Sequence, residues 1–430
     1  MTKTTNFLKN IFKAYYQENA HDIPEINQFE QREFGFIPWD KPIMQRHKQF
    51  ITGDKFKAYL IKNAPMHVYH SGAVYKNPDD LQMQDKGYLG CDLLIDIDVD
   101  HFYTPCKEEH DIWQCKECGA SGKGMVEKCP QCGKLKLSRL SWICDACLNA
   151  AKNEIIKLID NFLVPDFSID RDAMQVAFSG HRGYHLKIED PNLRTLTTDE
   201  RREIVDYLTG ENLSFELLGF HGKSSGTIIG LLKENIGWSQ KIVVKLEELL
   251  QQDEASLEYF LGDPNKANLN PNLVKSFLNY KDKFLSHITS QERTRAIWAI
   301  EGFTLNKWKQ LLTAIVNEIG IEIDEPVSID VHRLIRYPGS LHGKTGFKVQ
   351  ELTYSDLFKF NPLNEPNPAI DPLVFESKKE MTQKIQIIKD LVPKTHMKGE
   401  TYGEYTLGEQ VEIPHHVAVF LLSKGVAKII

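Results

Sequence analysis

The sequence contains no run of 18 or more apolar residues, which is about the length that a membrane-spanning helix needs. Its first residues, from Met1 to Thr5, lack the apolar stretch of a secretory signal peptide. We therefore expect neither membrane insertion nor secretion, and we expect a reducing, cytosolic compartment. Cysteine is also missing from most of the chain, because all 8 cysteines lie between Cys91 and Cys147. This confinement favours metal ligation over a disulfide framework.

The sequence also has no excess of basic residues. The chain has 52 Lys and Arg against 59 Asp and Glu, a net charge of −7, so it has no overall attraction to nucleic acid. Any such binding must come from local basic patches or from bound metal ions. The other proportions, 41% hydrophobic and 26% charged in 430 residues, are those of a globular protein with room for two or three domains.

Acidic and apolar residues alternate in the stretch from Cys91 to Asp100. Side chains alternate across a β-strand, so one face would pack on a core through Leu93, Ile95, Ile97 and Val99. The other face would carry Asp96, Asp98 and Asp100. Neighbouring carboxylates repel, and divalent Mg²⁺ or Mn²⁺ ions of the kind used in nucleotidyl transfer would relieve this repulsion. The solvated outer face of an edge strand is the alternative interpretation.

Two Cys-x-x-Cys pairs separated by ten residues have the spacing of a zinc ribbon: Cys115, Cys118, Cys129 and Cys132. Four further candidate ligands flank this ribbon and would close a second zinc site: Cys106, His110, Cys144 and Cys147. Unligated buried thiols are the alternative for both sets. Cys91 is left over on the apolar face of the acidic strand, where we expect it in the core.

A polar turn between two predicted strands, 175–178 and 184–188, concentrates hydroxyl, imidazole and guanidinium groups: Ser179, His181, Arg182 and His185. Such groups suit a triphosphate. Gly180 and Gly183 would allow the backbone to approach a ligand closely. A structural hairpin with two buried histidines is the alternative. Further along the chain, Asp324 or Asp330 could complete a three-carboxylate metal site. Further basic side chains follow in the sequence: Arg333, Arg336, His342 and Lys344.

Apolar periodicity predicts the remaining elements. Helices are expected over 6–17, 44–63 and 149–162, and a strand over 66–75 is expected to pair with the acidic strand. Residues 192–318 read as mainly helical, 321–327 as β-structure, and 414–430 as a small amphipathic element.

Together these residues resemble the small catalytic subunit of archaeo-eukaryotic DNA primase, archaeal type. The family's three signatures occur in order: Asp96-Ile-Asp98, Ser179-Gly-His-Arg-Gly-Tyr-His185, and Asp324 eighteen residues before His342. The resemblance covers most of the chain and implies an α+β fold, a primase catalytic core of mixed sheets flanked by helices, with a zinc-binding insertion and a helical subdomain. The implied divisions are 1–105 for the first part of the core, 106–148 for the zinc knuckle with its inserted ribbon, 149–191 for the second part of the core, 192–318 for the helical subdomain, and 319–430 for the return of the core and the C-terminal segment.

The resemblance also implies the activity, which is template-directed synthesis of short RNA or DNA primers from NTPs or dNTPs on single-stranded DNA for replication. Asp96, Asp98 and Asp324 would bind two Mg²⁺ or Mn²⁺ ions, with Asp324 preferred over Asp330 for its spacing to His342. The implied nucleotide-binding residues are Ser179, His181, Arg182, His185, Arg336 and His342. The family's zinc knuckle maps onto Cys106, His110, Cys144 and Cys147, whereas the ribbon from Cys115 to Cys132 is an additional insertion.

A large subunit with an iron–sulfur domain is the implied partner, and the location would be cytoplasmic for an archaeal-type protein and nuclear for a eukaryotic one. Two other functions stay open. The same core serves primase-polymerases that extend existing ends in repair, and a zinc-ribbon nucleic-acid-binding protein could carry an acidic strand that is only structural. Metal-dependent incorporation of labelled nucleotide on single-stranded DNA would separate an enzyme from a binder.

Overall fold

The computed structural model describes all residues except 225, 265, 290–297, 299–302 and 377–380. Contacts divide the chain into two compact units. The core unit comprises Met1–Ile156, Asp170–Arg201 and Ile323–Ile430, and the helical unit comprises Lys157–Ile169 and Arg202–Glu322. Over the described ranges, no helix combines the length and apolar character needed to cross a membrane. The predicted α+β class is confirmed, since several sheets and their flanking helices make up the chain.

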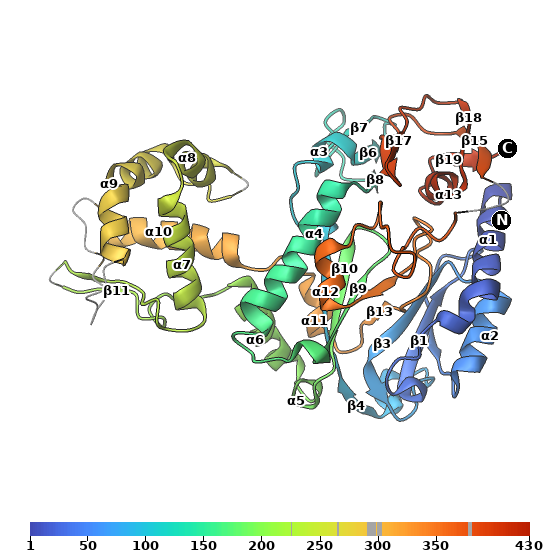
Figure 1. Ribbon diagram of the computed structural model, residues 1–430, viewed down its shortest axis with the longest axis horizontal. Coiled ribbons are helices and arrows are strands. Elements are labelled where there is room, and N and C mark those ends of the chain that lie inside the picture. The colour runs from blue at the N-terminus through green and yellow to red at the C-terminus, as the bar shows by residue number, and fades with distance from the viewer. Residues whose placement is uncertain (225, 265, 290–297, 299–302, 377–380) are drawn as a thin grey trace. The chain divides into compact units, whose positions relative to one another are not determined.

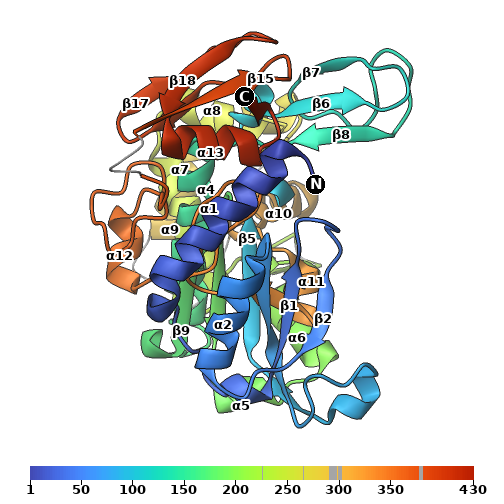
Figure 2. The ribbon, with the colours of Figure 1, turned by 90° about the vertical axis from the view of Figure 1, so that its right-hand side faces the viewer.

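The first sheet of the core unit has the strand order β13-β3-β1-β2, with β4 paired to β3. Its strands are β1 (Arg32–Ile37), β2 (Gln45–Lys48), β3 (His67–Tyr75), β4 (Tyr88–Cys91) and β13 (Leu334–Arg336). Helices α1 (Lys3–Asn19) and α2 (Gly53–Asn63) lie together against this sheet, as Figure 2 shows. An aromatic-rich core fills the layer between them, around Phe12, Phe34, Phe56 and Tyr337. Large buried rings of this kind contribute much of a core's stability.

The second sheet carries the acidic strand and has the order β14-β9-β10-β5. Its strands, all antiparallel, are β5 (Leu93–Asp98), β9 (Met174–Phe178), β10 (Gly183–Ile188) and β14 (Gln350–Leu352). The alternation in β5 is as predicted, because Leu93, Ile95 and Ile97 are buried while Asp96 and Asp98 stay partly exposed. The pairing is not as predicted, because β5 pairs with β10 and not with β3.

Asp92 marks the point where the chain passes from the first sheet to the second. Its fully buried carboxylate lies 2.7 Å from Nη2 of Arg32 and 2.7 Å from Nη2 of Arg194. The guanidinium of Arg201 donates to the Asp92 carbonyl at 3.2 Å. This ion-paired junction separates β4, which pairs with β3, from β5. Alternation alone predicts one continuous strand here, because it does not reveal which partner each half takes.

Two small modules complete the core unit. The ribbon sheet has the order β7-β6-β8, from β6 (Ile112–Cys115), β7 (Ser121–Lys123) and β8 (Leu137–Leu140). The C-terminal sheet has the order β18-β15-β19, from β15 (Thr382–Ile387), β18 (Gln410–Pro414) and β19 (Ala427–Ile429), and packs on α13 (His415–Ser423). The predicted amphipathic character of the C-terminal element is wrong, because Val417 to Leu422 are all buried. The Ile429 amide donates to Thr4 at 3.2 Å, so both ends of the chain meet (Figure 1).

The helical unit consists mainly of α7 (Trp238–Gln251), α8 (Glu254–Gly262), α9 (Pro271–Thr289) and α10 (Leu305–Ile319), and Figure 1 shows α7 beside α9 and α10. Its core includes two packed indoles, since the Trp298 and Trp308 ring centroids lie 4.7 Å apart with the rings tilted by 39°. A short β11–β12 pair (His221–Gly222, Ile228–Ile229) belongs to the same unit. Residues 290–297 and 299–302 of the predicted helical subdomain lie outside the described residues.

The remaining α-helices and strands connect these parts of the chain. They are α3 (Lys107–His110), α4 (Asp145–Leu158), α5 (Pro191–Arg194), α6 (Thr198–Thr209), α11 (Glu325–Ile329), α12 (Tyr354–Lys359) and the hairpin of β16 (Thr395–Met397) and β17 (Glu400–Tyr402). Two predictions of local secondary structure are also wrong. The predicted helix 44–63 is helical only from Gly53, because the Glu33 carboxylate binds Arg46 at 2.8 Å and the His47 amide at 3.0 Å and holds β2 extended. The predicted β-structure at 321–327 is absent: residues 321–324 form no helix or strand, and α11 begins at Glu325 with Pro326, a favoured residue, in its first turn.

Candidate active site and metal-binding clusters

The acidic strand turns its carboxylates into a cavity of about 210 Å³ that Asp96, Asp98 and Asp100 help to line. Burial, followed by the charges of Asp98 and Asp324, raises the pKa of Asp96 well above its usual range. Oδ1 of Asp96 is buried and accepts no hydrogen bond from the described residues. Buried polar atoms normally have a partner, and a divalent cation would supply one. The donor set, hard carboxylate oxygens with raised proton affinity, fits Mg²⁺ or Mn²⁺.

Strand β10 supplies the opposite side of this cavity. His185 stands directly across from Asp96 in the strand register, with its Nε2 3.4 Å from Oδ1 of Asp96. Burial and the Arg336 charge lower the pKa of His185 to about 3, so the imidazole is neutral at pH 7. The neutral imidazole is therefore not a counter-ion to the Asp96 carboxylate.

The turn that leads into β10 needs both of its glycines for protein packing. A Cβ on Gly183 would lie 2.4 Å from the Ile97 carbonyl oxygen, where β10 approaches β5. Gly180 has a φ of +79°, and a Cβ there would lie 2.7 Å from Cβ of His342. The close approach that we expected between these glycines and a ligand is thus an approach to neighbouring protein atoms. It brings the turn's polar side chains against the acidic strand.

The third carboxylate beside Asp96 belongs to Asp324. The Asp324 amide donates to the Asp96 carbonyl at 2.9 Å, which anchors the start of α11 to the acidic strand. Asp330 instead lies 3.4 Å from Arg333 and accepts from the His332 amide at 2.9 Å. Of the two candidates, the structure brings Asp324 next to Asp96.

Strand β13 brings bases into the cavity from the first sheet. Nη1 of Arg336 lies 2.7 Å from Nδ1 of His67, and its guanidinium lies 5.0 Å over the Tyr69 ring. The His342 ring stacks on His181 with centroids 5.2 Å apart. Burial, then the Arg336 charge, lowers the pKa of His342 well below its usual value. The cavity thus brings together most of the predicted nucleotide-binding residues with Asp96 and Asp98: Ser179, His181, His185, Arg336 and His342.

Arg182, which was expected to bind the nucleotide, lies outside the cavity. Its side chain is 2% exposed, and all of its hydrogen bonds go to protein acceptors. Nε donates to Asp100 at 2.6 Å, and Nη1 and Nη2 donate to the two oxygens of Asp111 at 2.9 and 2.8 Å. Nη1 also reaches the Trp142 carbonyl at 2.9 Å. The guanidinium therefore ties the end of the acidic strand to the segment between Cys106 and Cys147 and does not line the cavity formed by the described residues.

Both predicted cysteine sets assemble into compact clusters whose ligand atoms lie within 4.8 Å of one another. In the outer cluster, Sγ of Cys147 lies 3.3 Å from Sγ of Cys106 and 3.4 Å from Nε2 of His110. In the ribbon, the Sγ atoms of Cys115 and Cys132 are 3.6 Å apart, as are those of Cys118 and Cys129. These separations exceed an S–S bond of about 2.05 Å and suit ligands around one ion. Both clusters are therefore able to bind metal.

Two residues that sequence reasoning missed contact the predicted ones. Oδ1 of Asp111 lies 2.9 Å from Nδ1 of His110, as a carboxylate supporting a metal-bound histidine would. The only sign of this role in the sequence is that Asp111 directly follows the candidate ligand His110. Lys424, at the end of α13, places Nζ 2.9 Å from Nε2 of His181. The two residues are 243 positions apart, and the sequence carries no sign of their contact.

Comparisons with known proteins agree with this geometry. The family model of the DNA primase small subunit matches residues 139–354. The DNA primase small subunit PriS of Methanothrix thermoacetophila is 33% identical over 450 residues, covering 100% of this chain and 99% of the relative. The PriS proteins of Archaeoglobus fulgidus, 32% identical, and Methanosarcina mazei, 29% identical, cover 98% and 99% of this chain and 98% and 97% of their own lengths.

The DNA primase small subunit family is a family of nucleotidyltransferases, and a cavity that joins clustered carboxylates to basic side chains agrees with that class. Within that class, the chain belongs to the DNA primase small subunit family. It has the role of the catalytic subunit of a DNA primase, and the archaeal-type resemblance is confirmed.

Proposed function

We propose that this chain synthesises primers on single-stranded DNA with Asp96, Asp98 and Asp324 holding two divalent ions, Mg²⁺ or Mn²⁺. The observation that carries this proposal is the buried Oδ1 of Asp96, which accepts no hydrogen bond from the described residues and lies at a cavity that Arg336 and His342 also line. When bound, such ions would lower the pKa of the attacking 3′ hydroxyl and offset the charge of the leaving pyrophosphate.

We propose that the chain's own bases hold the incoming triphosphate. Arg336 offers a guanidinium fork that spans two phosphate oxygens, and its stack on Tyr69 fixes the plane of that fork. Lys424 donates to Nε2 of His181, so the ring proton of a neutral His181 sits on Nδ1. Ser179, His185 and His342 line the same cavity with further polar atoms. These fixed donors would stabilise negative charge in the transition state without reorganising.

Arg182 has a positioning role in this proposal. Its guanidinium forms ion pairs with Asp100 at the end of the acidic strand and with Asp111 beside the outer cysteine cluster. Because each of those carboxylates accepts from the same guanidinium, a shift of the cluster would be transmitted to the strand that carries Asp96 and Asp98. Arg182 thus orients metal ligands and need not touch the nucleotide.

The direct test is incorporation of labelled NTPs and dNTPs on single-stranded DNA with added Mg²⁺ or Mn²⁺. We propose a primase large subunit with an iron–sulfur domain as the partner that starting a chain requires, so the assay is run with and without it. We also propose a cytoplasmic site of action, since the relatives named above are archaeal. Incorporation that continues in the presence of a chelator would contradict the metal-dependent mechanism.

Replacing Arg336 with lysine is expected to raise the nucleotide KM roughly tenfold, with folding stability changed little. Lysine keeps one positive charge but loses the two-pronged phosphate contact and the stack on Tyr69. Steady-state incorporation on a primed template at saturating Mg²⁺ measures this. Arg333→Lys is the matched control, because Arg333 lies in an exposed ion pair with Asp330. Equal KM values for Arg336→Lys and the parent would give Arg336 a purely structural role.

We propose Zn²⁺ in both cysteine clusters, and we expect metal analysis to find two zinc ions per chain. Cys129→Ser should remove one ion and unfold the ribbon alone, because a module this small cannot bury enough core to fold without metal. Basic side chains including Lys128, Lys134 and Arg139 surround the ribbon, so template affinity should fall more at low salt than at high salt.

Cys144→Ser is the contrasting variant. It opens the outer cluster, whose His110 is tied through Asp111 and Arg182 to the acidic strand. Incorporation on saturating primed template should therefore fall in Cys144→Ser and persist in Cys129→Ser. One zinc ion per chain in the parent, or global melting of Cys129→Ser, would contradict this division of roles.

A further inference from the structure

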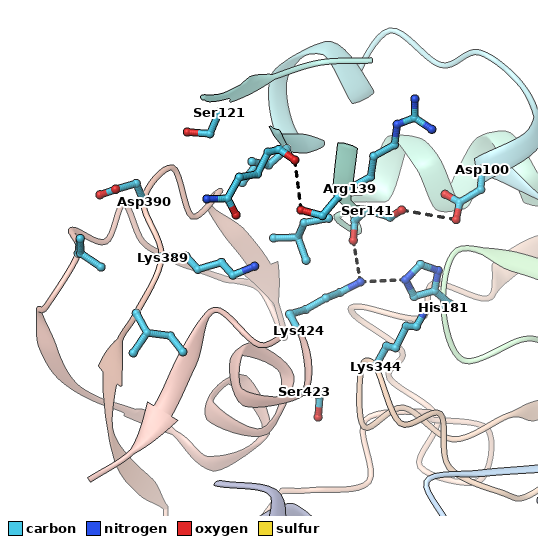
Figure 3. A pocket seen from close by; sticks show the side chains of 16 residues that line it. Asp100, Ser121, Arg139, Ser141, His181, Lys344, Lys389, Asp390, Ser423 and Lys424 are labelled. Atoms are coloured by element: carbon cyan, nitrogen blue, oxygen red, sulfur yellow. Dashed lines mark hydrogen bonds between the residues drawn. The ribbon is translucent and has the colours of Figure 1, made fainter. Parts of the chain in front are cut away.

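A second cavity, of about 530 Å³, adjoins the candidate active site within the core unit (Figure 3). The ribbon strands line one side of it, and the C-terminal module with α13 lines the other. Asp100, His181 and Lys344 line both this cavity and the cavity of the acidic strand. The two spaces therefore meet at the end of the active site where the proposed triphosphate-binding groups stand.

Lysines provide most of the charge around this second cavity: Lys344, Lys389 and Lys424. Within the described chain, neither Lys344 nor Lys389 forms an ion pair, so both charges are available. Arg139 also lines the space, but its guanidinium donates to the Val126 carbonyl at 2.8 Å. The acids present are Asp100, which is ion-paired with Arg182, and Asp390 at the C-terminal side. The net field therefore favours an anion.

Lys424 makes this preference stronger. Its side chain is 7% exposed, and its Nζ donates to the Ser141 carbonyl at 2.8 Å and to His181 at 2.9 Å, as the dashed lines of Figure 3 show. Burial, then repulsion from Arg182, lowers the pKa of Lys424 to about 7. A neighbouring anion would offset both effects and favour the charged ammonium. The protein thus places the buried Lys424 amine beside a polar cavity, with carbonyl and imidazole partners in place of a carboxylate.

We propose that this cavity binds pyrophosphate, the second product of primer synthesis, as it leaves the active site. The proposal rests on the proposed function. In that reaction the 3′ hydroxyl oxygen bonds to the α-phosphorus while the bond to the bridging oxygen breaks, the hydroxyl proton goes to water, and pyrophosphate is formed. Lys344 lines both cavities, so the diphosphate stays beside a positive charge as it passes from one cavity to the other.

The chemistry of the lining favours a free diphosphate over a nucleotide or a strand. Single-stranded nucleic acid and bases are usually held by stacking on aromatic rings. Among the described lining residues there is no Phe, Tyr or Trp, and the apolar ones are aliphatic, such as Leu140 and Ile388. A volume of about 530 Å³ accommodates a diphosphate together with bound water.

The test is product inhibition by pyrophosphate during nucleotide incorporation on a primed template. Lys389→Gln removes a charge from the cavity wall and lies outside the proposed nucleotide site. We expect it to raise the inhibition constant of pyrophosphate roughly three- to fivefold, the effect of one exposed charge pair, while the nucleotide KM stays within about twofold. Asp390→Asn should shift the inhibition constant in the opposite direction. Lys428→Gln, an equal charge change on the exposed side of β19, is the matched control and should change neither value.

Calorimetric titration of the full chain with pyrophosphate, with CMP and with single-stranded DNA separates the possible occupants. Weaker pyrophosphate binding by Lys389→Gln, with CMP and DNA binding unchanged, supports the proposal. Unchanged pyrophosphate inhibition in both Lys389→Gln and Asp390→Asn overturns it, as does a Lys389→Gln effect confined to CMP or DNA. Failure of the proposed function would show separately, as an Asp98→Asn enzyme that incorporates nucleotide like the parent.

Discussion

Asp98→Asn is expected to slow nucleotide incorporation by roughly 10³-fold or more while the fold stays intact. The substitution removes a charged oxygen from the proposed metal site but keeps the side-chain shape, and metal-bound charge is the main stabiliser of this transition state. Asp96→Asn should behave in the same way. Single-turnover incorporation on a primed template at saturating nucleotide measures the chemical step.

Asp98→Asn should preserve or raise thermal stability although it lowers activity. Burial and the neighbouring Asp100 raise the pKa of Asp98, so without metal the fold favours the protonated carboxyl. A carboxyl whose pKa is raised on folding stabilises the protein at low pH and loses that contribution as pH rises through the folded pKa. Asparagine resembles the protonated form, so at pH 7 the metal-free variant should melt at or above the parent's temperature.

Added Mn²⁺ should raise the melting temperature of the parent more than that of Asp98→Asn, because an ion that binds the folded state stabilises it. Asp330→Asn is the matched control, since this carboxylate lies beside Arg333 and away from Asp96. An Asp98→Asn enzyme that polymerises within tenfold of the parent would overturn the metal assignment.

Arg182→Met should destabilise the protein by about 3–5 kcal/mol, the usual cost of removing one partner from a buried ion pair. Asp111 is almost fully buried and Asp100 lies at the cavity edge, and both would lose their shared cation. Against the effect of burial, hydrogen bonds from His110 and Arg182 and the Arg182 charge lower the pKa of Asp111, so the loss of Arg182 should let that carboxyl take up a proton at a higher pH. Urea unfolding at pH 7 measures the free energy of unfolding.

The exposed ion pair of Arg333 gives the control for this variant. Arg333→Met should cost no more than about 1 kcal/mol, because exposed pairs contribute little. If Arg182 held phosphate instead of positioning the strand, Arg182→Met would keep its stability and show only a raised nucleotide KM. If Arg182→Met unfolds like the parent and shows such a KM change, the positioning role of Arg182 is contradicted.

The sequence predicted the parts of this site that depend on local pattern. The alternation of β5, the Cys-x-x-Cys knuckles and the turn from Ser179 to Gly183 each carry their chemistry within a few residues. Strand alternation, tetrahedral ligation and glycine-bearing turns are short-range physics, so one sequence is enough to predict them. The third carboxylate needed a longer argument, and Asp324 was separated from Asp330 at the sequence level only by its spacing to His342.

The parts that could not be predicted depend on which distant groups meet. Arg182 carries the same charge whether it faces a phosphate or two carboxylates, and only the fold shows that Asp100 and Asp111 reach it first. The sheet change at Asp92 is similar, because the pairing partner of a strand is a long-range property. Lys424 ends an apolar helix where a lysine would ordinarily be solvated. Lys424 is buried against His181 because the C-terminal module packs on the rest of the core unit.

The ribbon's anchoring has a consequence for how such a protein can change. Strands β6 and β8 pair in register, with Ile112 opposite Leu140, so the segment leaves and rejoins the fold at neighbouring points. Residues directly opposite in antiparallel strands have Cα atoms only about 4.5–5.5 Å apart. A short hairpin turn would bridge that gap without altering the path of the chain on either side. The position between Cys106–His110 and Cys144–Cys147 is therefore a graft site, where a lineage or a protein engineer can exchange one module for another and leave the chemistry of the acidic strand in place.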